Sequence, residues 1–419
     1  MSEIRTACCI VGGGPAGMMA GFLLARAGVD VTVLEKHADF FRDFRGDTIH
    51  PSTLQMLSEA GLLERFLARP HDEVQRLAGQ VGQDIVHLAD FDHLPTVCKF
   101  IAFMPQWDFL DFLRDEAAAY PTFRLLMQTE CTDLIAEGGR IAGVMARGPQ
   151  GELTIRAGLV LATDGRHSVV RDRARLPVRK FGAPMDVLWM HVPKEPGDTV
   201  QTLGFAGAGR ILVLIDRKSY WQAGFVIAKD TYAQMRAKPI DQLHEEMLAL
   251  APFLRGRIRA ISSWDDISFL EVRVDRLERW YAPGVLCIGD AAHAMSPIGG
   301  VGINLAIQDA VATANLLWEP LSSGGVQLKD LRAVQERRQF PTVATQSVQL
   351  FIQRAAVSAL LRATQIVHAP RILKILTAFS LFRRTTGRLI GLGFRPERIR
   401  SPIRAQALQR PAATANRTV

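Results

Sequence analysis

The sequence predicts an α/β fold in which a Rossmann-like domain is interleaved with an antiparallel β-sheet domain and followed by C-terminal helices. A glycine-rich turn between an apolar strand and a helix opens the chain and predicts the Rossmann-like part. Two more apolar strands, each followed by an aspartate, recur far downstream. Between these two strands, short runs of alternating polar and apolar residues predict the antiparallel sheet.

The N-terminal unit has the order strand, turn, helix, strand. Ala7–Val11 and Asp30–Leu34 are short apolar strands, and Pro15–Ala27 has the composition of a helix that ends at Gly28. The turn between the first strand and the helix is Gly12–Gly17, with the spacing GxGxxG. In this context the spacing predicts a dinucleotide-binding turn.

Each glycine of the turn has a separate physical role. Gly12 permits the tight turn, Gly14 lets a pyrophosphate approach the backbone, and Gly17 lets the helix pack closely on the strand. Pro15 and Ala16 begin the helix. The pyrophosphate is therefore expected at the positive end of the helix dipole, against unpaired backbone amides.

A carboxylate closes the second strand of this unit. Glu35 lies 18 residues after Gly17, and Lys36 follows it. A carboxylate here accepts hydrogen bonds from an adenosine ribose, whereas its charge repels a 2′-phosphate. We count both residues as contacts to the ADP half of FAD or NAD, and the site disfavours NADP.

Two distant segments distinguish a site for FAD from a site for NAD. Leu159–Thr163 is an apolar strand that ends at Asp164, and Val285–Ile288 is another that ends at Gly289 and Asp290. Because ligands bind outside the carboxyl ends of strands in such sheets, both aspartates are candidate ligand contacts. Asp290 is placed to accept hydrogen bonds from the ribityl chain of a flavin. Each aspartate alone has the alternative role of capping the following helix.

A second glycine-rich loop follows Asp290. Residues 297–302, which include Pro297, Gly300 and Gly302, open a helix that carries Asn304 near its start. The apolar positions of this helix recur at the spacing of one buried face. Its N-terminus adds positive potential, which stabilises the negative charge of a reduced flavin.

The middle of the chain predicts a substrate domain. Strands are expected at Met185–Val192, Thr199–Phe205, Ile211–Ile215 and Tyr220–Ile227, with Trp221 and Phe225 on one face of the last and Gln222 on the other. An apolar pocket for an aromatic substrate and a packed sheet face are both compatible with these aromatic side chains. The candidate substrate contacts are Trp189, Trp221 and Phe225 as pocket walls, with Gln222 and His50 as orienting groups.

These segments divide the chain into three parts. The expected nucleotide-binding domain comprises residues 1–73, 100–178 and 269–330, and the substrate domain comprises 74–99 and 179–268. Residues 331–419 form a basic helical extension, with helices expected at Thr342–Ala363 and Pro370–Arg384.

Charge is unevenly distributed along the chain. The net charge is +8, yet residues 329–419 hold 17 Lys or Arg against 3 Asp or Glu, so the preceding 328 residues carry −6. No nucleic-acid-binding motif accompanies this charge, and no nucleic acid is expected as a partner. Two interpretations stay open, a solvated helical cap and a peripheral contact with anionic membrane.

Composition excludes several classes of protein. The five cysteines form no CxxC pair and no cluster with histidine, so we expect no metal site and no disulfide framework. The N-terminus has no charged segment followed by a cleavage site, and no apolar run reaches the ~20 residues of a membrane span. We expect a cytoplasmic enzyme of undetermined oligomeric state.

Taken together, these motifs resemble those of the single-component, FAD-dependent aromatic hydroxylases typified by para-hydroxybenzoate hydroxylase. The resemblance covers roughly residues 5–318 and includes Arg45-Gly46-Asp47 and the segment 104–107. It implies that Arg45 and Gln106 contact the FAD pyrophosphate and ribityl region, that Asp164 serves both FAD and nicotinamide binding, and that the 299–302 backbone contacts the flavin ring. Halogenase relatives carry a Trp-x-Trp-x-Ile signature, and this chain has no Trp-x-Trp.

The resemblance implies a monooxygenase that uses NAD(P)H and O₂ to hydroxylate a phenolic or polyketide-like aromatic molecule through a flavin C4a-hydroperoxide. No general acid or base is identified by the sequence, so the catalytic residues are unknown. One alternative is a membrane-associated hydroxylase or epoxidase of a quinone or isoprenoid precursor. Another, of a different class, is a flavin- or ligand-binding protein without turnover.

Overall fold

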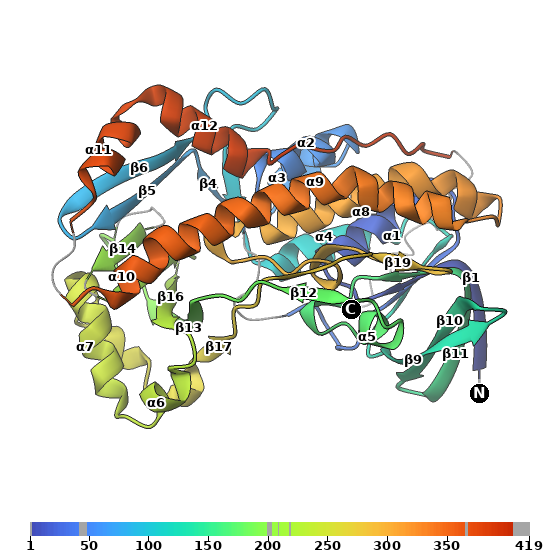
Figure 1. Cartoon of the computed structure of the whole chain (residues 1–419), viewed down its shortest axis with the longest axis horizontal. Coiled ribbons are helices and arrows are strands. Elements are labelled where there is room, and N and C mark those ends of the chain that lie inside the picture. Colours follow the sequence, from blue (N-terminus) through green and yellow to red (C-terminus); the bar gives the residue numbers. More distant parts are fainter. Residues whose placement is uncertain are drawn as a thin grey trace, which may run out of the picture.

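The computed structural model describes residues 2–41, 48–198, 203–207, 209–217, 219–364 and 368–404. It confirms an α/β architecture with C-terminal helices. Two sheets lie toward opposite ends of the long axis, and helix α9 (Leu328–Ile352) runs along the molecule between them (Figure 1). In the described residues, no helix combines the length and the hydropathy that crossing a membrane requires.

The N-terminal sheet has a parallel core. Strand β1 pairs in parallel with both β2 and β11, and β20 extends the parallel pairing on the far side of β11. The last four residues of β1 and of β11, together with β2 and β20, are apolar runs buried on both faces, as expected for a parallel sheet covered by helices. The sheet contains β1 (Ser2–Val11), β2 (Val31–Leu34), β8 (Phe123–Leu126), β9 (Glu130–Glu137), β10 (Arg140–Gly148), β11 (Gly151–Ala162), β19 (Tyr281–Ala282) and β20 (Val285–Cys287).

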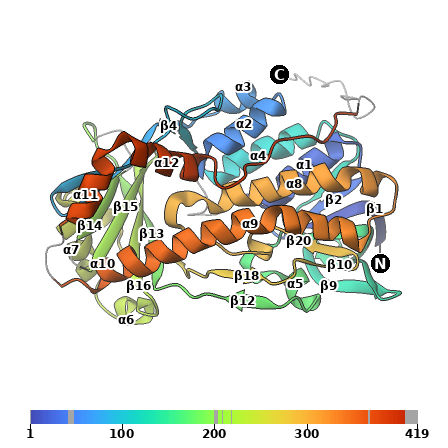
Figure 2. The same ribbon diagram turned by 45° about the horizontal axis from the view of Figure 1, so that its top comes forward.

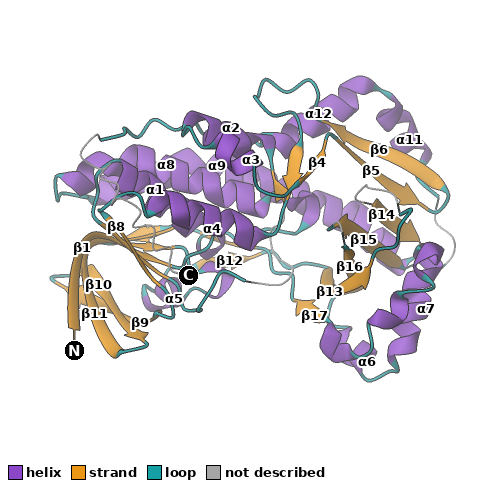
Figure 3. Ribbon diagram, turned by 180° about the vertical axis from the view of Figure 1, so that it is seen from behind, coloured by secondary structure: helices purple, strands orange, loops and turns teal. Residues whose placement is uncertain are grey.

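Helices cover this sheet, as Figure 3 shows from behind. Helix α1 packs against both α4 and α8. A Cβ added at Gly21 of α1 would lie 2.9 Å from Val33 Cγ2, so the close helix–sheet contact depends on glycine there. The helices of this lobe are α1 (Pro15–Arg26), α2 (Pro51–Glu59), α3 (Leu63–Leu67), α4 (Gln106–Ala117), α5 (Val169–Arg173) and α8 (Gly302–Ser322).

The second sheet is built from two parts of the chain. Its strand order is β17-β13-β16-β15-β14-β5-β6, so a hairpin from residues 76–90 extends a sheet formed mainly by residues 185–228. The strands are β5 (Arg76–Val81), β6 (Asp84–Asp90), β13 (Met185–Pro193), β14 (Leu203–Gly207), β15 (Arg210–Asp216), β16 (Tyr220–Ala228) and β17 (Ser268–Leu270). They match the four predicted strands, except that residues 199–202 lie outside the described ranges.

Helices α6 (Tyr232–Arg236) and α7 (Ile240–Leu250) cover the outer face of the second sheet (Figure 2). Smaller elements complete the described chain. These are strands β3 (Thr48–Ile49), β4 (Asp72–Val74), β7 (Ile101–Phe103), β12 (Val178–Lys180) and β18 (Asp275–Leu277), and short helices η1 (Gly165–His167), η2 (Pro252–Leu254), η3 (Ile258–Ala260), η4 (Trp264–Asp266), η5 (Gly289–Ala291) and η6 (Ile298–Gly300).

The C-terminal helices differ from the prediction in two places. The helix expected to begin at Thr342 begins at Leu328, and Pro341 lies inside it and is buried. Proline removes one helical hydrogen bond, yet tertiary packing of the buried face of α9 outweighs that loss. Helix α9 continues through the π-turn η7 (Gln353–Val357) into α10 (Ser358–Arg362).

The second difference is a break in the last predicted helix. Extended backbone at Phe379, with φ −79° and ψ 127°, divides it into α11 (Arg371–Ala378) and α12 (Ser380–Gly391).

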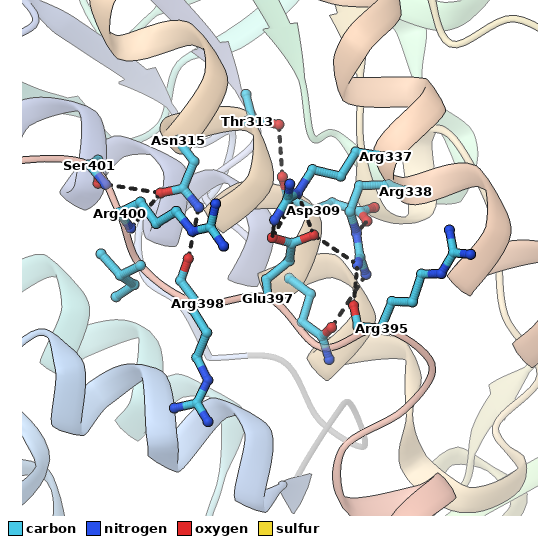
Figure 4. A network of polar contacts seen from close by, with 12 residues as sticks. Asp309, Thr313, Asn315, Arg337, Arg338, Arg395, Glu397, Arg398, Arg400 and Ser401 are labelled. Carbon is cyan, nitrogen blue, oxygen red and sulfur yellow. Dashed lines mark hydrogen bonds and ion pairs between the residues drawn. The ribbon is translucent and has the colours of Figure 1, made fainter.

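A buried ionic network ties the C-terminal segment to α8 and α9 (Figure 4). Arg338 Nε donates to Asp309 Oδ1 at 2.8 Å, and its Nη1 lies 3.4 Å from Glu397 Oε1. The second oxygen of Asp309 lies 2.6 Å from His293 Nε2. Burial by itself would raise the pKa of Asp309, but the adjacent His293 and Arg338 charges and hydrogen bonds bring that pKa below its usual value. Asp309 is therefore a carboxylate that the fold needs in its ionised form.

Asn315 holds the same segment farther along α8. Its Nδ2 donates to Arg398 O at 2.8 Å, and its Oδ1 accepts from the amides of Arg400 and Ser401 at 2.7 and 2.9 Å. The segment is thus bonded to the lobe of the N-terminal sheet through both side chains and main chain.

Replacing Arg338 by methionine is expected to destabilise the protein by about 3–5 kcal/mol, because two buried carboxylates lose their shared partner. Urea unfolding followed by circular dichroism measures the loss. Arg332→Met, on the exposed side of the same helix, is the matched control and should leave the unfolding midpoint almost unchanged, since its pairing with Glu336 is solvent-exposed. Equal midpoints for the two variants would contradict the prediction.

Candidate functional site

Three loops leave the N-terminal sheet side by side. Val11 pairs with Ala162, and Ala162 pairs with Cys287, so the strands β1, β11 and β20 end at the same level. Thr163 N donates to Val11 O at 2.8 Å and Ile288 N donates to Ala162 O at 3.0 Å. The glycine-rich turn and the two aspartate loops therefore converge at one edge, as the sequence predicted.

Close packing explains two of the three fingerprint glycines. Gly12 has φ +106°, and a Cβ there would lie 2.6 Å from Thr163 O. A Cβ on Gly17 would lie 2.0 Å from Gly12 O, which is a backbone atom that has no room to move. Thr163 Oγ1 donates toward Gly12 O at 2.7 Å and joins this turn to β11. Both glycines are therefore needed by the folded chain itself.

Gly14 is different, because the space in front of it is open. No heavy atom lies within 4 Å of the position that its Cβ would take. It is the N-cap of α1, it offers no side-chain cap, and Pro15 follows. The first-turn amides of a helix have no partner inside the helix. Open space in front of unpaired amides is what a pyrophosphate requires.

Glu35 ends β2 beside this turn. Its Oε2 accepts from Gly13 N at 3.1 Å and its Oε1 accepts from His37 N at 3.0 Å. The carboxylate is thus held by the fingerprint turn itself, next to the space in front of α1. Lys36 follows with an exposed side chain.

The two downstream aspartates differ in their surroundings. Asp164 accepts from Ser168 Oγ at 2.6 Å and from Val170 N at 3.2 Å, and burial raises its pKa. Its carboxylate thus bonds within the turn that begins α5, which is the capping role left open by the sequence. Asp290 remains partly exposed, 3.2 Å from Arg166 Nη2. Sequence reasoning did not identify this arginine as its partner, although the segment 164–168 contains it.

The loop that carries Asp290 touches two helices. Gly289 has φ +59°, and a Cβ there would lie 3.1 Å from Ala306 Cβ and 3.3 Å from Ala16 Cβ. Its amide donates to Asp309 Oδ2 at 3.1 Å. The buried network of Figure 4 therefore reaches the edge where the three loops meet.

The 297–302 loop is pinned to β3. Gly300 has φ +62°, its carbonyl accepts from Thr48 Oγ1 at 3.1 Å, and a Cβ would lie 2.6 Å from that hydroxyl. Asn304 uses its whole amide group on protein partners. Its Oδ1 accepts from His50 N and Thr53 Oγ1 at 2.9 and 2.8 Å, and its Nδ2 donates to Thr48 O and Gly300 O at 3.0 and 3.4 Å. The Asn304 side chain therefore positions the loop, which leaves only the backbone for a cofactor.

A family model described as "FAD binding domain" matches residues 5–348. The chain belongs to this family. It is 32% identical over 357 residues to the 6-methylpretetramide 4-monooxygenase of Streptomyces rimosus, covering 84% of this chain and 85% of that protein. It is 28% identical to a rifampicin monooxygenase of Streptomyces venezuelae, and there the match spans 74% of this chain and 63% of the relative.

Solved structures share the fold of this flavoprotein. A probable FAD-dependent monooxygenase of Pseudomonas aeruginosa, pqsL, superposes with a TM-score of 0.72 at 20% identity, over 85% of this chain and 97% of the other. The anhydrotetracycline hydroxylase OxyS of Streptomyces rimosus gives 0.70 at 21% identity, over 93% and 76%. The chain is accordingly an FAD-dependent oxidoreductase.

The residues at the converging edge fit the dinucleotide part of FAD. The open space at Gly14 and the free amides of α1 suit the pyrophosphate, and the partly exposed Asp290 suits a hydroxylated chain. Arg45, which the resemblance assigns to the same region, lies outside the described residues. Gln106 begins α4 directly after β7, with its side chain partly exposed. In the described part of the chain, no group of three or more His, Cys, Asp or Glu side chains is placed to hold a metal ion.

Glutamines of α9 hold the backbone of the flavin-side loops. Gln349 accepts from Ser296 N at 3.2 Å and donates to Ser296 O and Ile298 O, both at 2.9 Å. Gln346 donates to Asp275 O and Ala294 O at 2.8 and 3.1 Å. These side-chain amides form hydrogen bonds with the main chain of the loops, as a neighbouring β-strand would. Sequence reasoning missed them, since glutamine on a helix usually predicts an exposed position.

Only one face of the second sheet is turned toward the lobe built around the N-terminal sheet, which is here called the cofactor lobe. Trp189 packs on that face with Met185, Val226 and Ile298, the last from the 297–302 loop. Gln222 is buried, and its Oε1 accepts from Arg217 Nε at 2.9 Å. These two predicted substrate contacts are therefore on the side of the sheet that can meet a flavin-bound substrate.

Trp221 and Phe225 lie on the opposite face, which is the packed sheet face that the sequence left open as the alternative to a pocket wall. Both belong to the core formed under α7, with Leu243 and Met247 of that helix. Trp221 is fully buried, and its Nε1 donates to Asp198 Oδ2 at 3.1 Å. The alternation predicted along β16 is confirmed, but the packing of α7 decides that the aromatic face points away from the cofactor lobe.

His50 is buried at the start of α2 rather than exposed in a pocket. Its Nδ1 is 2.8 Å from Ile390 O, and since a carbonyl only accepts, Nδ1 carries the proton. Its Nε2 is buried, and no partner for it is found among the described residues. Burial lowers the pKa of His50 to about 4, so the ring is neutral near pH 7.

Replacement by alanine is expected to have different effects at Gly14 and at Gly17, at the start of α1. Gly14→Ala should leave the melting temperature of the FAD-free protein nearly unchanged but weaken FAD binding by tenfold or more, because its methyl group enters open space in front of the helix. Gly17→Ala should lower the melting temperature of the FAD-free protein, because its Cβ meets Gly12 O. Calorimetry and flavin-fluorescence titration separate the two effects. Loss of apo stability in Gly14→Ala would contradict this assignment.

The stability of the folded protein is expected to depend on pH through His50. The folded pKa of His50, about 4, lies below its unfolded value near 6.5, so its contribution to stability is complete above pH 6.5 and is lost as the pH falls toward 4. The loss amounts to about 3 kcal/mol. Unfolding free energies measured from pH 7 to pH 4 should fall less steeply for His50→Gln than for the unmodified protein. Parallel curves would overturn the neutral, buried assignment.

Proposed function

We propose that this flavoprotein hydroxylates an aromatic, phenolic or polyketide-like small molecule, using NAD(P)H as the reductant and O₂ as the oxidant. The relatives that support this proposal are monooxygenases, one of them matched over most of both chains. The observation that carries it is the convergence of the Gly12, Asp164 and Gly289 loops at one edge, together with a hydrophobic cluster against which both Trp189 of the second sheet and Ile298 of the 297–302 loop pack.

Bound FAD would supply hydride acceptance and the activation of O₂, and the protein supplies binding and orientation. We propose that the amides of α1 and the carboxylate of Glu35 hold the ADP half, and that Asp290 and the 299–302 backbone hold the flavin half. The oxygen-transfer route implied by the resemblance is part of the same proposal.

The substrate is proposed to lie between the 297–302 loop and the inner face of the second sheet. Trp189 supplies an apolar surface there, and Arg217 with Gln222 supplies a buried polar pair for a phenol or a carbonyl. No acid or base is assigned, because no described side chain is shown in contact with reacting atoms.

The discontinuous domain division stands as part of this proposal. Residues 1–73, 100–178 and 269–330 would hold the cofactor, and residues 74–99 and 179–268 would cover the substrate. The hairpin β5–β6, which joins the second sheet through β14, supports this division.

The proposed activity is tested with the purified full chain. The protein should bind FAD with flavin absorbance, and a panel of phenols and polycyclic aromatic polyketides should contain at least one that stimulates NAD(P)H oxidation. Mass spectrometry under ¹⁸O₂ should show one labelled oxygen atom in its product. Gln222→Leu should weaken substrate binding while FAD binding stays intact, with Arg332→Met as the surface control.

Other outcomes would overturn the proposal in identifiable ways. Peroxide without an oxygenated product indicates an oxidase or a flavin reductase. Tight ligand binding with no stimulated NAD(P)H oxidation indicates a binding protein without turnover.

A further inference from the structure

Helices α11 and α12 expose an apolar surface away from the cofactor lobe. Five residues form this surface, which is here called the α11 apolar face. Their exposed fractions are 68% for Ile372, 59% for Ile375, 40% for Leu376, 62% for Phe379 and 75% for Leu381. Ile372, Ile375 and Leu376 recur at the spacing i, i+3, i+4 and form one stripe along α11, and Phe379 follows at the break before α12. Exposed hydrophobic residues that cluster in this way mark an interaction site.

The orientation of α11 is the reverse of an ordinary surface helix. Thr377 is its buried residue, and its hydroxyl is satisfied by Leu373 O at 2.8 Å. Ile372, Ile375 and Leu376 are exposed to solvent instead. A soluble helix normally buries its apolar stripe, so this arrangement leaves the stripe available for a partner.

Cations surround the stripe. No Asp or Glu occurs from residue 371 to residue 394. Arg384 and Arg388 lie one turn apart on the exposed side of α12, and Arg371 begins α11. In the described part of the chain none of these three arginines forms an ion pair. Lys374 is different, because Asp84 Oδ1 lies 2.6 Å away and neutralises it.

Both helices are firmly attached to the second sheet. Helix α12 crosses β6 so closely that a Cβ on Gly387 would lie 1.9 Å from Asp90 O. Arg383 Nη1 donates to Thr377 O and Ala378 O at 2.7 and 3.0 Å, which closes the end of α11 against α12. Figure 1 shows α11 and α12 lying beside β6. The α11 apolar face and its arginines are therefore carried on one rigid support.

We infer that this surface binds an anionic lipid bilayer. Apolar side chains beside unpaired arginines are the pattern of a helix that lies in the plane of a membrane interface. A second copy of the chain fits less well, because a two-fold contact would place the same arginines against each other. Helix α11 has 8 residues, so it lies on the bilayer and does not span it.

The surface is connected to the proposed substrate site. Helix α12 begins at the α11 apolar face, and near its other end Ile390 O accepts from His50 Nδ1. Ile390 and the following Leu392 belong to the same hydrophobic cluster as Phe103 and Trp189. Resting on the proposed function, this connection suits a substrate that partitions into lipid and enters beside α12. Membrane binding itself does not depend on that function.

The test is vesicle co-sedimentation of the FAD-loaded full chain. Mixed vesicles of phosphatidylcholine and anionic phosphatidylglycerol should bind the protein, and pure phosphatidylcholine should bind it weakly. Arg384→Gln/Arg388→Gln should bind roughly thirtyfold more weakly, at about 1 kcal/mol for each arginine. Ile375→Ser/Phe379→Ser should lose binding to both kinds of vesicle.

The control is Arg332→Gln/Ile403→Ser, which removes one exposed residue of each kind, a cation and an apolar residue, outside α11 and α12. Arg332 lies in the first turns of α9, and Ile403 adjoins Arg404, whose amide donates to Arg26 O at the end of α1. This control should bind vesicles like the unmodified protein. Melting temperature and FAD content show whether each variant is folded.

Three results would overturn the inference. These are equal binding to neutral and anionic vesicles, no binding to either, and a concentration-dependent dimer in light scattering that Ile375→Ser/Phe379→Ser abolishes. Because the readout is sedimentation, a failed activity assay leaves the result unaffected.

Discussion

The register of three parallel strands is the constraint on which the rest of the structure depends. Val11, Ala162 and Cys287 stand level in β1, β11 and β20, although about 150 and then 125 residues separate them along the chain. Both faces of these strands are packed, and a shift of the register would disrupt that close packing, so the apolar core keeps the strands aligned. The alignment brings three loops to one edge, where we propose the dinucleotide site.

Buried side chains then hold those loops in place. Asp309 accepts from Gly289 N, His293 and Arg338, and Asn304 and Gln349 bond the 297–302 loop through main-chain atoms. A buried polar group is stable only when it is satisfied, so each of these contacts opposes displacement of its loop. Rigid support for ligand contacts of this kind is a requirement of catalysis by orientation. The C-terminal segment joins the same network through Glu397.

Much of the fold and part of the site could be predicted from local patterns. The glycine-rich turn, four strands of each sheet and the alternation along β16 depend on neighbouring residues, and the described part of the structure has them where the sequence predicted. The prediction was wrong for the C-terminal helices, where distant contacts decide: helix α9 passes through Pro341, and extended backbone at Phe379 divides the last helix. The structure also chose between alternatives that the sequence left open, because Trp221 lies in the core under α7 and the carboxylate of Asp164 bonds within its own turn.

The sequence by itself determined the central strands of both sheets and the glycine-rich turn before the first helix, because these depend on periodicity and on backbone freedom over a few residues. Only the tertiary structure decided which face of the second sheet meets the cofactor lobe, which polar side chains are used within the fold, and that α11 turns its apolar stripe to solvent. Those outcomes depend on which element packs on which, and that depends on contacts between residues far apart in the chain.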